Sequence, residues 1–172
     1  MIELDPPVTT DQPSGDAVLL ARLGSRRYGL PLAAVERVLP MASVVPLPDS
    51  GPSMLGVLNV HGAVLPVIDP RHRLGLPSPT VCPEHRLILL STAGRRFLLW
   101  VDAVEDIVVG APGVLSAVPS PQASPLTGPH ATLEGVSLTP RVLRLEDGVV
   151  PILAPEALDA ARAGATSGGA VW

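Results

Sequence analysis

The sequence predicts an all-β fold, and three observations support this. Short apolar runs rich in Val, Leu and Ile recur along the chain, with turn signals about every 8–12 residues. Several runs occur as pairs separated by two residues that include a glycine, which is typical of β-hairpins. The 21 prolines among 172 residues fall mostly at the ends of these runs and in the segments between them. The pattern indicates a barrel or sandwich of about ten strands.

Three hairpins are predicted from two-residue turns. Each turn, Gly24–Ser25, His61–Gly62 and Ala93–Gly94, lies between two apolar runs of similar length. The runs that they join are residues 17–23 with 26–32, 54–60 with 63–69, and 86–92 with 95–101.

The other elements follow from shorter signals. The stretch "LAAVERVL" (32–39) predicts one or two helical turns. A helix is predicted over 155–163, because Pro155 suits a first helical position and Gly164 suits a stop. Four further strands are predicted, at residues 104–110, 131–138, 141–146 and 149–153.

These elements place a single domain at residues 17–163. Residues 1–16 are acidic and Pro-rich and predict a flexible tail, as does "GATSGGAVW" at 164–172. Residues 118–130 predict a long low-complexity loop. The start lacks the charge and apolar run of a signal peptide, and no apolar run reaches the roughly 20 residues of a membrane helix. We therefore expect a soluble cytoplasmic protein.

Charge and cysteine content argue against several classes of function. The net charge is −4, and arginines occur in scattered pairs rather than in the stripe that phosphate binding needs, so nucleic acid is not expected as a partner. The lone Cys82 excludes an internal disulfide and a multi-cysteine metal site. We interpret it as a structural or incidental thiol.

No catalytic constellation is apparent. The histidines lack the helical spacing of zinc proteases, and His72 lies between two arginines, which discourages a metal ion. Ser53 and Ser91 lack the glycine frame of a nucleophile elbow, and "GPSMLG" (51–56) has two glycines but no Lys, so it is not a phosphate-binding loop. The acidic residues Asp102, Glu105 and Asp106 are interpreted as an exposed turn. We predict no catalytic, cofactor-binding or metal-binding residues and no enzyme activity.

The most specific signal is "GVLNVHGAVLPVID" at residues 56–69. It resembles the motif G-x-x-N-L-R-G-x-x-x-P-x-x-D of the CheW family, the adaptors that couple bacterial chemoreceptors to the histidine kinase CheA. Gly56, Asn59, Gly62, Pro66 and Asp69 match that motif at its spacing.

Three other segments resemble the family in the same order. They are "ARLGSRRYGLPLAAVERV", "FLLWVDAVEDIV" and "DGVVPILAPEAL", so the resemblance runs from about Ala17 to Arg162. It implies two intertwined, small SH3-like β-barrels that share a core, followed by a short C-terminal helix.

The motif residues also have a physical interpretation that needs no chemistry. Gly56 and Gly62 suit positions where the backbone is crowded or has a positive φ. Asn59 can bond to nearby backbone groups at a strand end. Asp69 precedes Pro70 and is therefore directed toward an extended conformation.

Two positions depart from the family pattern. His61 stands where the motif has Arg, and a gap-free alignment places Arg37 where the family has a Glu that can pair with that Arg. An Arg–His pair cannot form that salt bridge. We consider His61 as a turn residue without a special role, as part of a modified partner surface, and as a metal ligand or catalytic base, the last having least support.

A further departure from the family pattern is the nearly uncharged stretch 39–55, which either forms an exposed apolar patch or packs between the two barrels.

The resemblance also implies a set of partner-binding positions. Carried over by position, the residues at or near partner surfaces are Val35, Arg37, Gly56, Asn59, His61, Gly62 and Val104.

The function that the resemblance implies is scaffolding without catalysis. The partners would be the cytoplasmic tip of a chemoreceptor and the regulatory domain of a CheA-type kinase, with receptors recruiting the protein to the inner face of the membrane. One alternative is a divergent adaptor of a motility or pilus pathway in which one partner interaction is lost or altered. The other is an enzyme or small-molecule binder on a β-barrel, which no residue pattern supports.

Overall fold

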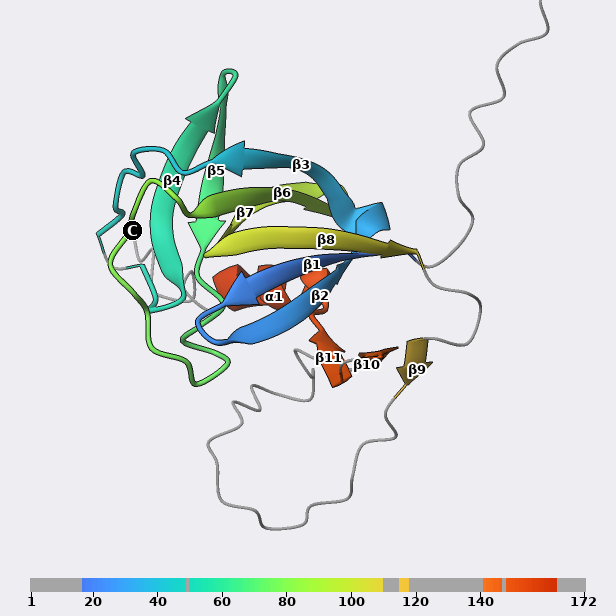
Figure 1. Cartoon of the computed structure of the whole chain (residues 1–172). Helices are drawn as coiled ribbons and strands as arrows, with labels where there is room; N and C mark the ends of the chain where they lie inside the picture. Colours follow the sequence, from blue (N-terminus) through green and yellow to red (C-terminus); the bar gives the residue numbers. More distant parts are fainter. Residues whose placement is uncertain (1–16, 49, 110–114, 118–140, 147, 164–172) are drawn as a thin grey trace, which may run out of the picture.

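The computed structural model describes residues 17–48, 50–109, 115–117, 141–146 and 148–163, which form two β-sheets and a helix (Figure 1). The two predicted tails, the predicted loop at 118–130 and the predicted strand at 131–138 lie outside the described residues.

The first sheet, sheet A, takes its strands from both ends of the domain. Its order is β8-β1-β2-β11-β10-β9. The strands are β1 (Ala17–Leu23), β2 (Arg26–Pro31), β8 (Ala103–Val109), β9 (Leu115–Ala117), β10 (Arg141–Leu145) and β11 (Gly148–Ile152).

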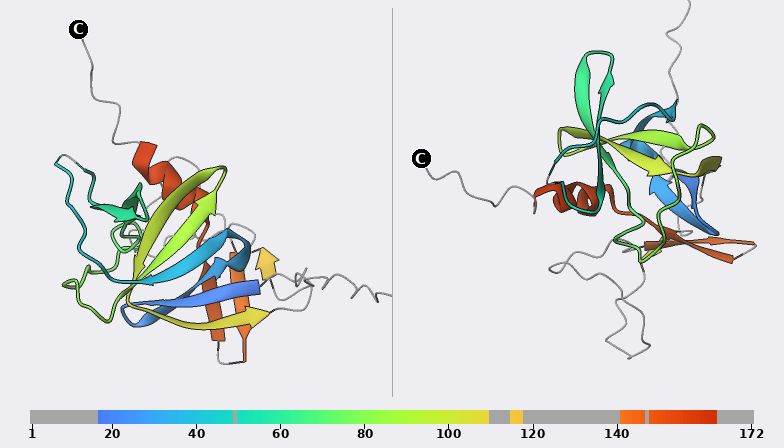
Figure 2. Two further views of the ribbon diagram at one scale, coloured as in Figure 1. Left: turned by 90° about the horizontal axis from the view of Figure 1, so that it is seen from above. Right: turned by 90° about the vertical axis from the view of Figure 1, so that its left-hand side faces the viewer.

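The middle of the chain forms the second sheet, sheet B, in the order β3-β6-β7-β5-β4. The strands are β3 (Val35–Pro40), β4 (Met54–Val60), β5 (Ala63–Ile68), β6 (Arg86–Thr92) and β7 (Arg95–Val101). The chain thus leaves sheet A after β2 and returns to it at β8, which confirms the predicted intertwining. Two views show the β4–β5 hairpin projecting from the body of sheet B (Figures 1 and 2).

All three predicted hairpins are confirmed, and two of them have the backbone expected of type I′ turns. His61 and Gly62 have φ of 50° and 89°, and Ala93 and Gly94 have φ of 47° and 76°. Both residues of such a turn need positive φ, which matches the right-handed twist of the strands.

The central strands are continuous apolar runs because both of their faces are buried, as the burial of β6 and β7 shows. Along β6, Leu87 and Leu89 belong to one buried cluster, whereas Ile88 and Leu90 belong to another. The second cluster also contains Leu19, Leu23 and Leu30 of sheet A, so it is a core shared by the two sheets. A third cluster, on the far face of sheet A, joins Val18 and Leu20 to β10 and β11. The predicted shared core is therefore confirmed.

The predicted barrels are not confirmed as closed structures. Within the described residues, β3 and β4 are the edge strands of sheet B and do not pair with each other. The segment after β3 instead returns to β4 through a single bridge between Val45 and Val57. Likewise, β2 and β11 of sheet A pair at one position only, Gly29 with Ile152. Because Pro151 has no N–H to donate, the ladder does not continue toward the start of β11.

The helical predictions have different outcomes. The helix α1 (Pro155–Ala163) occupies the predicted residues. It is attached to the β6–β7 hairpin, since Arg95 Nη1 lies 3.1 Å from Asp159 Oδ2 and Thr92 Oγ1 lies 3.2 Å from Glu156 Oε1. The helix predicted at 32–39 was wrong for most of its length. Only Leu32–Ala34 form a 3₁₀ turn, η1, and the rest is β3, because pairing with β6 outweighs the weak local preference.

Candidate partner-binding site

Four of the seven predicted site residues lie on the β4–β5 hairpin, and three of these shape its turn. Asn59 Oδ1 accepts a hydrogen bond from the Gly62 N–H at 2.8 Å, as its predicted backbone role requires. His61 occupies the left-handed region and is exposed at the turn. The hairpin thus presents the imidazole to solvent on a backbone fixed by its neighbours, and the predicted turn position of His61 is confirmed.

Gly56, the fourth hairpin residue, is buried and has φ of 148°. A Cβ at this position would lie 2.2 Å from the Val45 carbonyl oxygen. That carbonyl accepts a hydrogen bond from the Val57 N–H at 2.8 Å, and the Val45 N–H donates to the Val57 oxygen at 2.9 Å. Gly56 therefore permits the close approach that joins the segment after β3 to β4, as its sequence interpretation predicted.

Arg37 lies beside a β-bulge on the edge strand β3. Val35 pairs with Leu90 and Arg37 pairs with Leu89, so Glu36 is the extra residue of the bulge. The Glu36 carboxylate is engaged within the sheet, where its Oε2 lies 2.8 Å from Arg96 Nη2 of β7. Arg37 is exposed and makes no ion pair within the described part of the chain.

Val35 and Val104 lie on different sheets and both pack against the shared core. Val35 begins β3 directly after η1, whereas Val104 lies near the start of β8, where it pairs with Ala21 of β1. Both are half-buried. No hydrogen bond or ion pair between described side chains joins either valine to the His61 turn. The predicted residues therefore do not form one site: four lie on the hairpin, two on β3 and one on β8.

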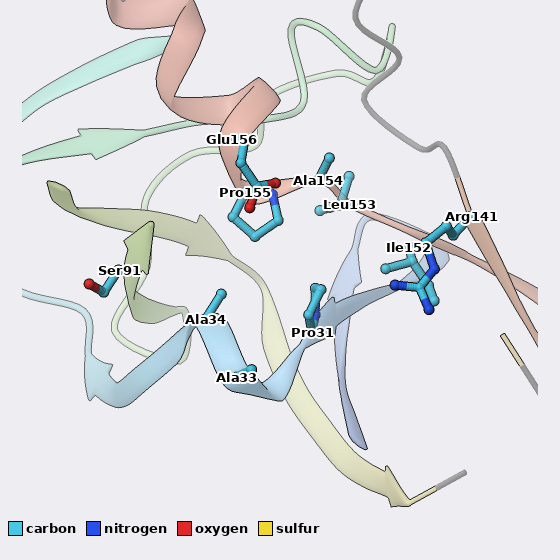
Figure 3. A pocket seen from close by; sticks show the side chains of 10 residues that line it. All are labelled: Pro31, Ala33, Ala34, Ser91, Arg141, Ile152, Leu153, Ala154, Pro155 and Glu156. Atoms are coloured by element: carbon cyan, nitrogen blue, oxygen red, sulfur yellow. The ribbon is translucent and has the colours of Figure 1, made fainter. Parts of the chain in front are cut away.

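A groove that the sequence did not predict lies next to Val35. Its cavity has a volume of about 410 Å³ and lies between η1, the end of β6 and the β11–α1 connection (Figure 3). The lining is mainly apolar, with Ser91, Arg141 and Glu156 as its polar members. The complete lining consists of Pro31, Ala33, Ala34, Ser91, Arg141, Ile152, Leu153, Ala154, Pro155 and Glu156. These residues are far apart in the sequence, which explains why no local pattern revealed the groove.

Of the two interpretations of the 39–55 stretch, the exposed patch is right for part of it, and packing between two barrels is not confirmed. Leu39, Met41 and Val44 pack against the cluster of Leu87 and Leu89, which lies on sheet B alone and is separate from the core shared by the two sheets. In contrast, Val45 and Leu47 are 61% and 39% exposed. This exposed part is flanked by prolines and adds an apolar surface beside β4.

A buried polar network, also absent from the sequence predictions, connects the two sheets. Arg71 is fully buried, and its guanidinium lies 3.0 Å from Asp69 Oδ1 and 2.5 Å from Asp102 Oδ1. The other oxygen of Asp102 accepts a hydrogen bond from the Gly24 N–H in the β1–β2 turn. The prediction of an exposed turn at Asp102, Glu105 and Asp106 was wrong. Asp102 is engaged in this network with its side chain 15% exposed, and Glu105 and Asp106, although exposed, lie on strand β8.

No group of three His, Cys, Asp or Glu side chains among the described residues is placed to hold a metal ion. None of the helices in the described part has the length and apolar character needed to cross a membrane.

Comparison with known proteins identifies the family. The model of the CheW-like domain matches residues 17–162. A probable chemotaxis protein CheW of Rhizobium etli is 32% identical over 106 residues, which cover 61% of this chain and 68% of the relative. The chemotaxis protein CheW of Rhizobium meliloti is 32% identical over 94 residues, covering 55% of this chain and 61% of the relative.

A solved structure supports the fold. The scaffolding protein TtCheW from Thermoanaerobacter tengcongensis superposes with a TM-score of 0.68 at 21% identity. The superposition covers 81% of this chain and 89% of that chain.

Proposed function

Because the chain belongs to the CheW-like domain family, we propose that it is a non-catalytic adaptor that couples a chemoreceptor to a CheA-type histidine kinase. The observation that carries this proposal is the family match over residues 17–162, together with relatives named as chemotaxis protein CheW. The proposed site of action is the cytoplasm, at receptors in the inner face of the membrane.

An adaptor of this kind acts by holding its partners in register. A conformational change in the receptor then biases kinase activity only if the adaptor binds the two receptor states with different affinities. The adaptor needs two surfaces on a rigid body, and the shared core with its Arg71 network supplies the rigidity.

For the receptor, we propose the surface of Val35 and Arg37 on β3 with the adjacent groove. A half-buried valine beside an apolar groove suits a helical partner, which inserts apolar side chains at helical spacing. The position of Val35 and Arg37 in the family pattern and the nearness of Val35 to the groove support this assignment, and Val104 is included from the family pattern alone.

The charge at this surface should define which receptor is recognised. Arg37 is exposed, and Glu36 is engaged by Arg96, so a partner residue facing Arg37 is expected to be acidic. Charge complementarity of this kind mainly sets specificity and the rate of encounter.

A charge-reversal experiment tests the proposed receptor surface. The protein and its Arg37→Glu variant would each be titrated against the cytoplasmic fragment of a receptor from the same host. We expect the variant to bind at least about tenfold more weakly, whereas reversal of Arg144 on β10, an exposed arginine of sheet A, should change affinity little. Equal affinities for the protein and Arg37→Glu would refute the assignment.

A second candidate function is an adaptor of a motility or pilus pathway with one altered partner interaction. The replacement of the family's Glu and Arg by Arg37 and His61 is the observation that favours it. The double variant Arg37→Glu with His61→Arg distinguishes this candidate function from the first one. Gain of binding to a chemotaxis receptor of the same host would support the altered pathway, and loss of binding to that receptor would support the first proposal.

A further inference from the structure

A second cavity lies on another part of the molecule, beside the buried polar network. Its volume is about 400 Å³, and it shares no residue with the groove next to Val35. It is lined by the β1–β2 hairpin near its turn, the segment after β5, the residue that precedes β6 and the residue that follows β7. The lining residues are Arg22, Gly24, Pro77, Ser78, Pro79, His85 and Asp102.

His85 provides this cavity with a hydrogen-bond donor. The residue is only 7% exposed, and its Nδ1 accepts hydrogen bonds from Trp100 Nε1 at 3.1 Å and from the Cys82 N–H at 3.3 Å. Because Nδ1 is an acceptor, the neutral ring carries its proton on Nε2. The Asp102 Oδ1 atom lies 3.6 Å from Nε2, which is too far for a good hydrogen bond.

Asp102 provides an acceptor beside this donor. Its Oδ1 accepts from Arg71 at 2.5 Å and its Oδ2 accepts from the Gly24 N–H, so each oxygen has one partner among the described residues. An ionised carboxylate offers about four acceptor positions, so about two remain for a ligand. The Asp102 side chain is 15% exposed, and it lines the same cavity as His85.

We propose that this cavity binds a primary carboxamide, the side chain of Gln or Asn on a protein partner. The carboxamide oxygen accepts from His85 Nε2–H, and its NH₂ donates to Asp102, so one planar group satisfies both neighbours. Pro77 and Pro79 form an apolar wall for the methylene groups. This proposal does not depend on the proposed coupling function.

The same arrangement discriminates against close analogues of Gln. A Glu side chain would place its carboxylate, which has no hydrogen to donate, against the Asp102 carboxylate, so this contact would lack a hydrogen bond and bring two like charges together. An alkyl side chain of the same length would leave the His85 donor and the Asp102 acceptor without partners, which sites built for hydrogen bonding reject strongly.

The test is a titration of the ¹⁵N-labelled full chain with three small probes, followed by NMR. The probes are the N-acetyl methylamides of glutamine, glutamate and norvaline. For glutamine we expect saturable shifts of the Gly24 and Ser78 amides and of His85 Nε2, with roughly millimolar affinity. For the other two we expect at least about tenfold weaker binding. Equal responses to all three probes, or no saturable response to glutamine, would overturn the proposal.

A variant tests the role of His85 directly. In His85→Asn, the amide oxygen can still accept from Trp100, but the donor at Nε2 is lost. Affinity for the glutamine probe should fall at least about tenfold, whereas His72→Asn, an exposed control, should bind as the parent does. Unchanged affinity in His85→Asn would contradict the proposal. If that variant does not fold, the selectivity of the parent protein among the three probes still decides.

Discussion

The backbone of Gly56 passes so close to Val45 that even one methyl group at Gly56 would lie 2.2 Å from the Val45 carbonyl oxygen. This contact is where the segment after β3 joins β4, through the pair of hydrogen bonds between Val45 and Val57. It fixes the position of the exposed residues Val45 and Leu47 beside the hairpin that carries His61.

We predict that Gly56→Ala destabilises the fold by at least about 2 kcal/mol, because the new Cβ meets backbone atoms that cannot rotate away. Urea denaturation measures the free energy of unfolding. The matched control is Gly62→Ala, which also has a positive φ but has no atoms within 4 Å of the new Cβ. The control should cost only about 1–2 kcal/mol. Similar losses in the two variants would show that the close approach to Val45 is unimportant.

The turn at His61 should become more stable with a better residue for its backbone. His61→Asn is expected to raise the free energy of unfolding by a few tenths of a kcal/mol up to about 1 kcal/mol, because Asn-Gly is favoured in type I′ turns. His61→Val, which carries a β-branched residue into positive φ, should do the opposite. Urea denaturation of both variants checks this, and a less stable Asn variant would argue that the imidazole itself supports the hairpin.

Removal of the buried cation should be far more damaging. Arg71→Met leaves the Asp69 and Asp102 carboxylates without their partner, and breaking a buried ion pair costs about 3–5 kcal/mol. The control is Arg26→Met at an exposed arginine, which should change stability by less than about 0.5 kcal/mol. Thermal and urea unfolding of the two variants compare the effects. A loss below about 1 kcal/mol for Arg71→Met would mean that the network does not hold the sheets together.

Alkylation of the single cysteine, Cys82, should need a higher pH in the folded protein than in the unfolded chain. Burial raises the pKa of the Cys82 thiol, and a hydrogen bond to the Glu84 carboxylate adds to this effect. Because the thiolate is the reactive form, the midpoint of the pH profile for alkylation should lie above that of the urea-unfolded chain. Glu84→Gln should lower the midpoint. A folded-state midpoint at or below the unfolded value would contradict this environment.

Local features of the fold could be predicted from the sequence. The hairpins were predictable because two-residue turns with glycine have few alternatives, and the helix at 155–163 because Pro155 and Gly164 mark its ends. The strand character of Val35–Pro40 was not predictable, since it arises from pairing with β6, about 50 residues later.

Features made by distant residues could not be predicted. The sequence predicts an exposed Asp102 because Glu105 and Asp106, which follow closely, are also acidic. Its actual partners, Arg71 and Gly24, are separated from it by 31 and 78 residues. The groove next to Val35 and the cavity beside His85 are likewise lined by segments that meet only in the folded chain.

The proposed coupling function is tested most directly by one measurement, a pull-down of the tagged protein from a lysate of its own host, with the bound proteins identified by mass spectrometry. We predict recovery of both a chemoreceptor and a CheA-type kinase, and a weaker receptor signal with Arg37→Glu. Recovery of neither partner, with the folded protein present on the resin, would contradict the proposed function and leave the CheW-like fold as it stands.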